Sequence, residues 1–259
     1  MCERGMKISV VTLSFNQRLF LEQALRSVID QGYENLEYIV VDPGSTDGSR
    51  ELIKEYRSEL AAIIFEPDKG AADGLNKGFA KATGQIFAFL NADDLLLRGS
   101  LNTVAEHFRD HPICDILMGD GFIIDAEGRR QKHVRARDFT VRRYLHGGCR
   151  WLQQATFFRQ SIFSRSSGFN VVNRTCWDGE LFVKMVNDGA VVEYLQKDLA
   201  EFRIHANSIS GSNSNFVQYR DDSYRIYREI CGRDWGAIAS GQHALYRAEG
   251  LFLRIAAGR

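Results

Sequence analysis

Residues 86–94, Ile-Phe-Ala-Phe-Leu-Asn-Ala-Asp-Asp, decide the fold, because five apolar residues lead directly into a polar turn with two adjacent acids. A short apolar run that ends in turn residues is typical of a buried strand. Three similar runs precede it, at residues 7–13, 36–41 and 62–65. Stretches with apolar residues at helical spacing separate the runs, as in Leu21, Leu25 and Val28. Repeated strand–helix–strand units with short connections predict an α/β fold with a mostly parallel sheet flanked by helices.

The rest of the chain is more mixed. We expect Asn16 to cap the first helix and Gly32 to end it. Further helices are expected at about 72–82, 100–109 and 179–186, and strands near 191–195 and 199–204. Apolar runs at 116–118 and 122–124 precede an expected turn at 125–128. The tail from residue 215 onward is expected to be helical.

Composition excludes several classes of protein. The 259 residues carry 33 Lys+Arg and 33 Asp+Glu, and a net charge of zero disfavours dedicated nucleic-acid binding. No apolar run approaches the roughly 20 residues of a membrane-spanning helix, and the N-terminus lacks a signal-peptide core. The five cysteines are scattered, odd in number and without a Cys-x-x-Cys pair. This pattern favours reduced thiols in the cytoplasm and does not predict a zinc cluster.

Carboxylates follow several of the expected strands. In parallel sheets, ligands bind beyond the carboxyl ends of the strands. The segments found there are residues 14–16, 42–48, 66–70 and 91–94. A divalent cation that bridges to phosphates would neutralise such a cluster of acids. The alternative, for Asp47 and Asp68, is that they only cap helices or shape turns.

Common nucleotide and hydrolase motifs are absent from the sequence. The glycine-rich residues 70–78 lack the Gly-Lys-Ser/Thr of a phosphate-binding loop, and no Gly-x-Gly-x-x-Gly follows the first strand. No Gly-x-Ser-x-Gly elbow of a serine hydrolase occurs.

An ordered set of segments carries a family resemblance over about residues 6–210. They include Val-Val-Asp-Pro-Gly-Ser-Thr-Asp-Gly at 40–48, and also residues 10–16, 73–78, 82–86, 90–94, 154–159, 168–170, 177–181 and 202–210. In this set the chain resembles the inverting family-2 glycosyltransferases, which have the GT-A fold. The resemblance implies a domain over 1–212, with a donor-nucleotide half at about 6–95 and an acceptor half at about 96–212, and a helical extension over 213–259.

The activity implied by the resemblance is metal-dependent transfer of a hexosyl or N-acetylhexosaminyl group. The donor would be a nucleotide sugar, with UDP as its nucleotide, and the cofactor Mn²⁺ or Mg²⁺. The acceptor would be a hydroxyl of a glycan or lipid-linked saccharide in bacterial-type polysaccharide assembly. Two other classes remain open: a sugar-nucleotide pyrophosphorylase, whose opening glycine-rich loop is missing here, and a non-catalytic nucleotide-sugar binding module or scaffold.

The resemblance also implies roles for individual residues. Asp178 matches the catalytic base, with Glu180 as its local competitor. Asp94 and His205 match metal ligands, and the roles of Asp93 and Asp94 are exchangeable. Gln154 and Trp177 match acceptor-binding positions. The positions implied for donor binding are Thr12, Phe15, Asp42, Asp73, Asn76, Asn91 and Asp93.

Three positions depart from the family pattern. Pro43 stands where a second acid often follows Asp42, and Asn91 replaces the first Asp of a strict Asp-x-Asp. Trp177 stands where many relatives have Glu before the base, which leaves the acceptor preference open.

A basic stretch covers residues 129–150 and holds eight Lys and Arg residues and one acid, Asp138, from residue 129 on. A solvated surface is the favoured interpretation. The alternative is contact with anionic lipid, which would place the protein at the inner face of the membrane.

Overall fold

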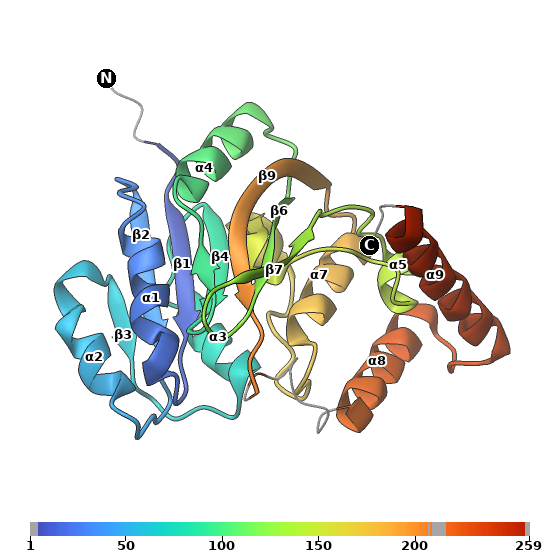
Figure 1. Ribbon diagram of the computed structural model, residues 1–259, viewed down its shortest axis with the longest axis horizontal. Coiled ribbons are helices and arrows are strands. Elements are labelled where there is room, and N and C mark those ends of the chain that lie inside the picture. The colour runs from blue at the N-terminus through green and yellow to red at the C-terminus, as the bar shows by residue number, and fades with distance from the viewer. Residues whose placement is uncertain (1–4, 207, 209–215, 257–259) are drawn as a thin grey trace.

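The computed structural model describes residues 5–206, residue 208 and residues 216–256. One mixed sheet runs through it in the order β3-β2-β1-β4-β8-β6-β9-β5, and β7 pairs with β6 (Figure 1). Its strands are β1 (Ile8–Leu13), β2 (Leu36–Val41), β3 (Ala62–Ile64), β4 (Ile86–Asn91), β5 (Leu95–Leu96), β6 (Ile116–Ile124), β7 (Arg130–Val134), β8 (Thr156–Arg159) and β9 (Val192–Arg203).

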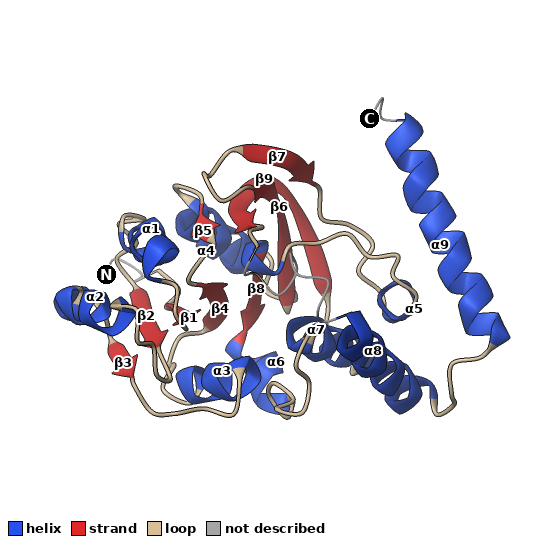
Figure 2. Cartoon of the chain, turned by 60° about the horizontal axis from the view of Figure 1, so that its bottom comes forward, coloured by secondary structure: helices blue, strands red, loops and turns tan. Residues whose placement is uncertain are grey.

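Helices cover both faces of this sheet (Figure 2). On one face lie α1 (Arg18–Ile29), α2 (Ser49–Glu55) and α4 (Ser100–Asp110), which share an apolar core with β1, β2 and β4. On the other face lie α3 (Ala71–Phe79), α6 (Gln160–Arg165) and α7 (Trp177–Asn187), which form a second core. The predicted α/β class with a mostly parallel, helix-flanked sheet is confirmed.

Parallel pairing fixes which strand ends meet. Strands β1, β2, β3 and β4 are parallel, and the antiparallel β8 between β4 and β6 makes β6 and β9 run in the same direction as β4. The carboxyl ends of all these strands except β8 therefore lie along one edge of the sheet. The chain order reverses between β1 and β4, which is where open α/β sheets form a crevice.

Strands β6 and β9 are continuous, where the sequence predicted two short runs in each case. Between Gly119 and Asp120 of β6, the pairing partner on β9 shifts from Leu195 to Asp198. The polar residues Gln196 and Lys197 therefore bulge out of the ladder without ending the strand. The predicted turn at 125–128 is confirmed, since the chain returns there from β6 to β7.

The cap of α1 also differs from the expectation. Asn16 has φ +52 and accepts a hydrogen bond from the backbone N–H of Thr46 at 2.9 Å. The N–H of Arg18, the first residue of α1, donates instead to Asp47 Oδ2 at 2.9 Å. A loop after β2 therefore supplies the cap, because it lies beside the start of α1 at the carboxyl edge.

The remaining helices are η1 (Arg57–Glu59), α5 (Val141–Leu145), η2 (Gln153–Ala155), α8 (Phe216–Cys231) and α9 (Ala237–Ala256). Helix α8 packs against α5 and α7, with Ile226 and Tyr227 buried in the second core. The domain boundary at residue 212 stays a prediction. Across the part of the chain that the structure describes, no helix is both long and apolar enough to span a bilayer.

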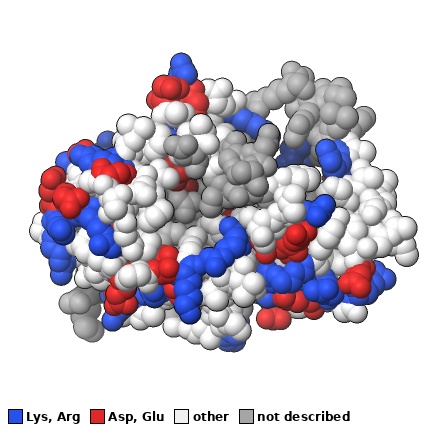
Figure 3. All heavy atoms as spheres, turned by 90° about the horizontal axis from the view of Figure 1, so that it is seen from below, with Lys and Arg blue, Asp and Glu red and all other residues white. Residues whose placement is uncertain are grey.

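Acids and bases are interspersed on the surface, as the face in Figure 3 shows. Within the basic stretch, Arg129 pairs with Asp125 and Arg130 pairs with Glu201, at 2.8 and 2.7 Å. Arg143 pairs with Glu249 on α9 at 3.0 Å. Acids from outside the stretch thus offset part of its charge, in agreement with a solvated surface.

Candidate active site

A cavity of about 730 Å³ opens at the carboxyl edge of the sheet. The loops after β1 and β4 form one wall, which includes Phe15, Asn91 and Asp93. The chain near η2 and the start of α7 form the opposite wall, which includes Gln154, Trp177 and Asp178. All six residues were predicted for the site, and the fold brings them together from segments up to 160 residues apart along the chain.

Asp93 and His205 meet at this wall. Asp93 lines the cavity, and its Oδ2 lies 3.0 Å from Nε2 of His205, two residues beyond the end of β9. The imidazole also packs against the ring of Phe20, with centroids 4.8 Å apart. A carboxylate and an imidazole that converge at the edge of a polar cavity suit a divalent cation such as Mn²⁺.

Asp94 points away from the cavity and is fully buried. Its Oδ2 accepts hydrogen bonds from the side-chain amides of Asn91 and Gln154, at 3.2 and 2.8 Å. Its Oδ1 accepts from the backbone N–H of Arg203 at 2.9 Å. Burial, followed by the neighbouring Asp93 carboxylate, raises the pKa of Asp94 well above its usual value. Of the two adjacent acids, Asp93 is therefore the one that faces a ligand.

Arg203 holds the turn that carries these acids. Its side chain is buried, and its Nε donates to the backbone carbonyl of Asp93 at 2.8 Å. Its Nη1 reaches the carbonyls of Asp125 and Ala126, and its Nη2 reaches Oε1 of Gln23. Because a guanidinium offers five donors in a fixed plane, one side chain links the ends of β4, β6 and α1. Arg203 is a positioning residue that the sequence argument missed.

Asp178 stands on the opposite wall, at the second residue of α7. Burial raises the pKa of this carboxyl to about 6, and the backbone N–H groups of Gly179 and of Asp178 itself only partly offset the effect. Such a carboxyl is largely ionised at neutral pH yet basic enough to accept a proton, as a general base requires.

Glu180, the competing acid, turns to the other side of α7. Its carboxylate accepts from Arg225 at 2.6 Å, from Lys184 and Asn170 at 2.7 and 2.8 Å, and from Asn173 at 2.7 Å. Burial alone would raise the pKa of Glu180, but these hydrogen bonds lower it to about 2. Glu180 is not among the residues that line the cavity, and its charge is already matched.

Four predicted donor-binding residues lie outside the cavity lining. Thr12 bonds to the hydroxyl of Tyr38 at 2.8 Å inside the sheet. Asp42 is buried and receives hydrogen bonds from Ser14, Ser45 and Arg50, so it shapes the loop that places Pro43 on the wall; that sentence of contacts ends with Oδ2–Ser45 Oγ at 2.6 Å.

The other two of the four lie on α3. Asp73 accepts from the N–H of Lys69 and pairs with Lys77, at 2.9 and 3.1 Å. Asn76 bonds twice to the backbone of Phe169, at 2.8 and 2.9 Å, and so joins α3 to the loop before α7. Their contacts with a donor stay predictions, since the observed partners all belong to the protein.

Asp68 lines the cavity, although the sequence allowed it to be a simple turn residue. Burial raises its pKa, and the N–H of Gly70 donates to its Oδ1 at 2.8 Å. A Cβ at Gly74 would lie 2.6 Å from Asp68 Oδ2 and 2.8 Å from Leu13 Cδ1, so only glycine lets α3 approach this closely. The sequence signal was the acid just after β3, at the same edge as Asp93.

Comparison with known sequences gives a consistent result. A family model described as glycosyl transferase family 2 matches residues 9–173. The chain is 28% identical over 227 residues to an uncharacterized glycosyltransferase of Nostoc sp., covering 82% of this chain and 70% of that protein. It is 27% identical over 228 residues to the putative teichuronic acid biosynthesis glycosyltransferase TuaG of Bacillus subtilis, covering 86% and 88% of the two chains.

Solved structures share the fold. Residues 1–349 of S. aureus TarS in complex with UDP-GlcNAc match with a TM-score of 0.70 and 19% identity. That match covers 87% of this chain and 65% of the TarS chain, so this chain spans just under two thirds of it. The mannosyltransferase PcManGT of Pyrobaculum calidifontis, in complex with GDP-Man and Mn²⁺, matches with a TM-score of 0.67 and 16% identity, over 95% and 70% of the two chains.

Proposed function

We propose a specific reaction for this chain, which belongs to glycosyl transferase family 2 and is a glycosyltransferase. The reaction is transfer of a hexosyl or N-acetylhexosaminyl group from a UDP-sugar to a hydroxyl of a glycan or lipid-linked saccharide, with inversion at the anomeric carbon. The observation that carries it is one cavity with Asp93 and His205 on one wall and Asp178 on the other.

The donor would lie along the wall formed by the ends of β1 and β4. Phe15 lines the cavity with 57% of its surface exposed, so its ring is available to stack on a nucleobase. Asn91 and Asp68 add polar groups beside it. A UDP donor is supported by the likeness to TarS in complex with UDP-GlcNAc, while the complex of PcManGT with GDP-Man makes guanosine the alternative.

Asp93 and His205 would hold the divalent cation. Their ligand atoms lie 3.0 Å apart, and the donor set of one carboxylate and one imidazole, completed by diphosphate oxygens, fits Mn²⁺ or Mg²⁺. When bound, the cation supplies positive charge that stabilises the departing nucleoside diphosphate. The notebook role of Asp94 passes to Asp93, because Asp94 lies beneath the wall with all its printed contacts inside the protein.

Asp178 would act as the base. It takes the proton of the acceptor hydroxyl as the new bond forms between that oxygen and the anomeric carbon. The bond from the anomeric carbon to the diphosphate breaks on the opposite side, and the electron pair leaves with the diphosphate. Trp177 and Gln154, on the same wall, would position the acceptor sugar.

Polysaccharide assembly is the proposed setting. Relatives include the teichuronic acid glycosyltransferase named above and a Campylobacter jejuni glucosyltransferase that acts on a saccharide linked to diphospho-undecaprenol. Such acceptors would bring the protein to the cytoplasmic face of a membrane. Contact between residues 129–150 and anionic lipid stays a prediction.

A thermal-shift experiment tests the donor and metal assignments. UDP, UDP-GlcNAc, UDP-glucose and GDP-mannose are each added with and without Mn²⁺. A ligand at about 100 times its Kd stabilises the folded state by about 2.7 kcal/mol. We expect a UDP-sugar to raise Tm in wild type when Mn²⁺ is present, and Asp93→Asn to lose most of that metal-dependent rise.

Asp30→Asn, an exposed substitution at the end of α1, is the matched control and should respond like wild type. A metal-dependent rise that survives in Asp93→Asn but disappears in Asp94→Asn would overturn the metal assignment. Slow release of UDP from a UDP-sugar by the wild-type protein, in Mn²⁺ without acceptor, would exclude the non-catalytic binding module.

A further inference from the structure

A second group of metal-binding side chains lies at the opposite edge of the sheet from the cavity. His107 and His111 lie at the end of α4 and just beyond it, Cys114 follows in the next turn, and Glu193 is the second residue of β9. The register pairs Glu193 with Leu117 near the start of β6, while Phe202 at the cavity pairs with Ile123 near its end. The two sites are thus at opposite ends of the same strands.

Both imidazoles point at one carboxylate oxygen. His107 Nε2 and His111 Nδ1 lie 2.8 and 2.7 Å from Oε2 of Glu193. Their rings are stacked, with centroids 4.1 Å apart and an angle of 9° between planes. Histidines four residues apart share one face of a helix, which is the spacing that lets two imidazoles bind a single ion.

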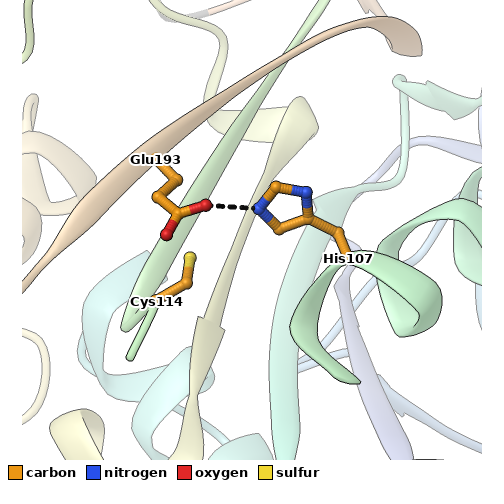
Figure 4. Close-up of side chains that lie close together, drawn as sticks. All are labelled: His107, Cys114 and Glu193. Atoms are coloured by element: carbon orange, nitrogen blue, oxygen red, sulfur yellow. Dashed lines mark hydrogen bonds and ion pairs between the residues drawn. The ribbon is translucent and has the colours of Figure 1, made fainter. Parts of the chain in front are cut away.

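Cys114 adds a sulfur to the same point. Figure 4 shows the side chains of His107, Cys114 and Glu193 directed toward one another. Their ligand atoms all lie within 4.8 Å of each other, and the thiol is buried. A tetrahedral zinc ion with bonds of about 2.0–2.3 Å places its ligand atoms roughly 3.3–3.8 Å apart. Small side-chain rotations therefore bring this group to the required spacing.

The backbone that carries the cluster is held in place. Arg159 Nε donates to the carbonyl of Cys114 at 2.7 Å, and its Nη2 donates to the carbonyls of Phe108 and His111 at 3.0 and 3.2 Å. One guanidinium from the end of β8 therefore fixes the end of α4 and the following turn. A rigid backbone lowers the entropic cost of gathering ligands around an ion.

We propose that His107, His111, Cys114 and Glu193 form a structural zinc site that joins the end of α4 to the start of β9. Two imidazoles, a thiolate and a carboxylate are ligands that zinc accepts, and a closed set of four suits a structural site. The sequence did not predict it, because zinc motifs are recognised by paired cysteines, whereas here Glu193 arrives from a distant strand. The proposal is independent of the function proposed for the cavity.

Cobalt spectroscopy on the full chain tests the site. The protein, stripped of metal under reducing conditions, is titrated with Co²⁺ and then with Zn²⁺. We expect one equivalent of Co²⁺ to give the visible bands of a tetrahedral ion and a thiolate charge-transfer band in the near ultraviolet, and Zn²⁺ to abolish both. The melting temperature should rise with bound zinc, since the ion binds only the folded state.

Three ligand variants and three controls assign the site. Cys114→Ser should lose the charge-transfer band, while His107→Gln and Glu193→Gln should weaken zinc affinity by at least the roughly 10–100-fold that loss of a supporting group costs. The controls should leave the spectrum unchanged. They are His133→Gln in a separate His–Asp pair with Asp198, Cys231→Ser on the exposed side of α8, and Asp93→Asn in the cavity.

Two results would overturn the proposal. One is the absence of the charge-transfer band from wild type with its thiols confirmed as reduced. The other is a band that persists in Cys114→Ser. Neither result bears on donor binding, because the thermal-shift assay of the cavity depends on Asp93.

Discussion

The first turn of α7 presents two acids to two very different surroundings. On the side that faces the cavity, Asp178 meets no cation, and burial raises its pKa to about 6. On the side that faces α8, Glu180 is 1% exposed, yet hydrogen bonds from Arg225 and its neighbours outweigh burial and lower its pKa to about 2. Burial has the same sign for both, so the partners decide which acid remains available to take a proton.

The largest expected effect is on turnover when the cavity-facing acid is changed. Asp178→Asn keeps the shape of the side chain but removes its ability to accept a proton. We expect kcat to fall by about 10²–10⁴-fold, the usual contribution of a general base, while the Kd for donor with Mn²⁺ changes little. Single-turnover transfer and donor titration measure the two quantities separately. Near wild-type turnover would move the base elsewhere in the cavity.

The acid on the α8 side should affect stability instead. Glu180→Gln leaves Arg225 and Lys184 with only Glu229, which pairs with them at 2.9 and 3.0 Å. We expect the free energy of unfolding to fall by about 2 kcal/mol, because a buried charge loses its main partner. Urea denaturation measures the loss, and kcat should stay within a few-fold of wild type under conditions where the variant is folded. A collapse of kcat in the folded variant would contradict the division of roles.

The smallest effect is a pH dependence that separates the two acids in the wild-type protein. Protonation of Asp178 removes the base, so kcat/KM should fall as pH drops through about 6 and be about tenfold below its plateau at pH 5. Glu180 cannot produce this inflection, since its pKa is about 2. Glu180→Gln should therefore retain the same profile. A flat profile from pH 5 to 8 would remove Asp178 from the proton transfer.

Sequence patterns predicted the nucleotide half of the fold well. Strands β1 to β4 appear where apolar runs end in polar turns, because buried parallel strands must be apolar and their ends must carry the loops. The second half was predicted less completely. The short antiparallel β8 and the edge strand β7 have weak patterns, and the bulge in β9 interrupts its apolar alternation with polar residues.

At the site, residue types were easier to predict than their orientation. The pair Asp93-Asp94 was placed at the correct edge, but which carboxylate faces the cavity depends on Arg203 and Gln154, which approach from distant segments. The same holds for the caps: Asn16 was expected to cap α1, and Asp47 does so from another loop. Contacts of this kind depend on tertiary packing, which local spacing does not encode.

The ion pair between Glu180 and Arg225 also bears on how the chain may be shortened. A truncation at residue 212 would remove α8, leave the Glu180 carboxylate buried without its guanidinium, and uncover the apolar surface now filled by Ile226 and Tyr227. Both losses fall on the helix that carries Asp178. Expression fragments designed around the nucleotide-binding half therefore need to extend through Cys231, even though family likeness by motif ends near residue 210.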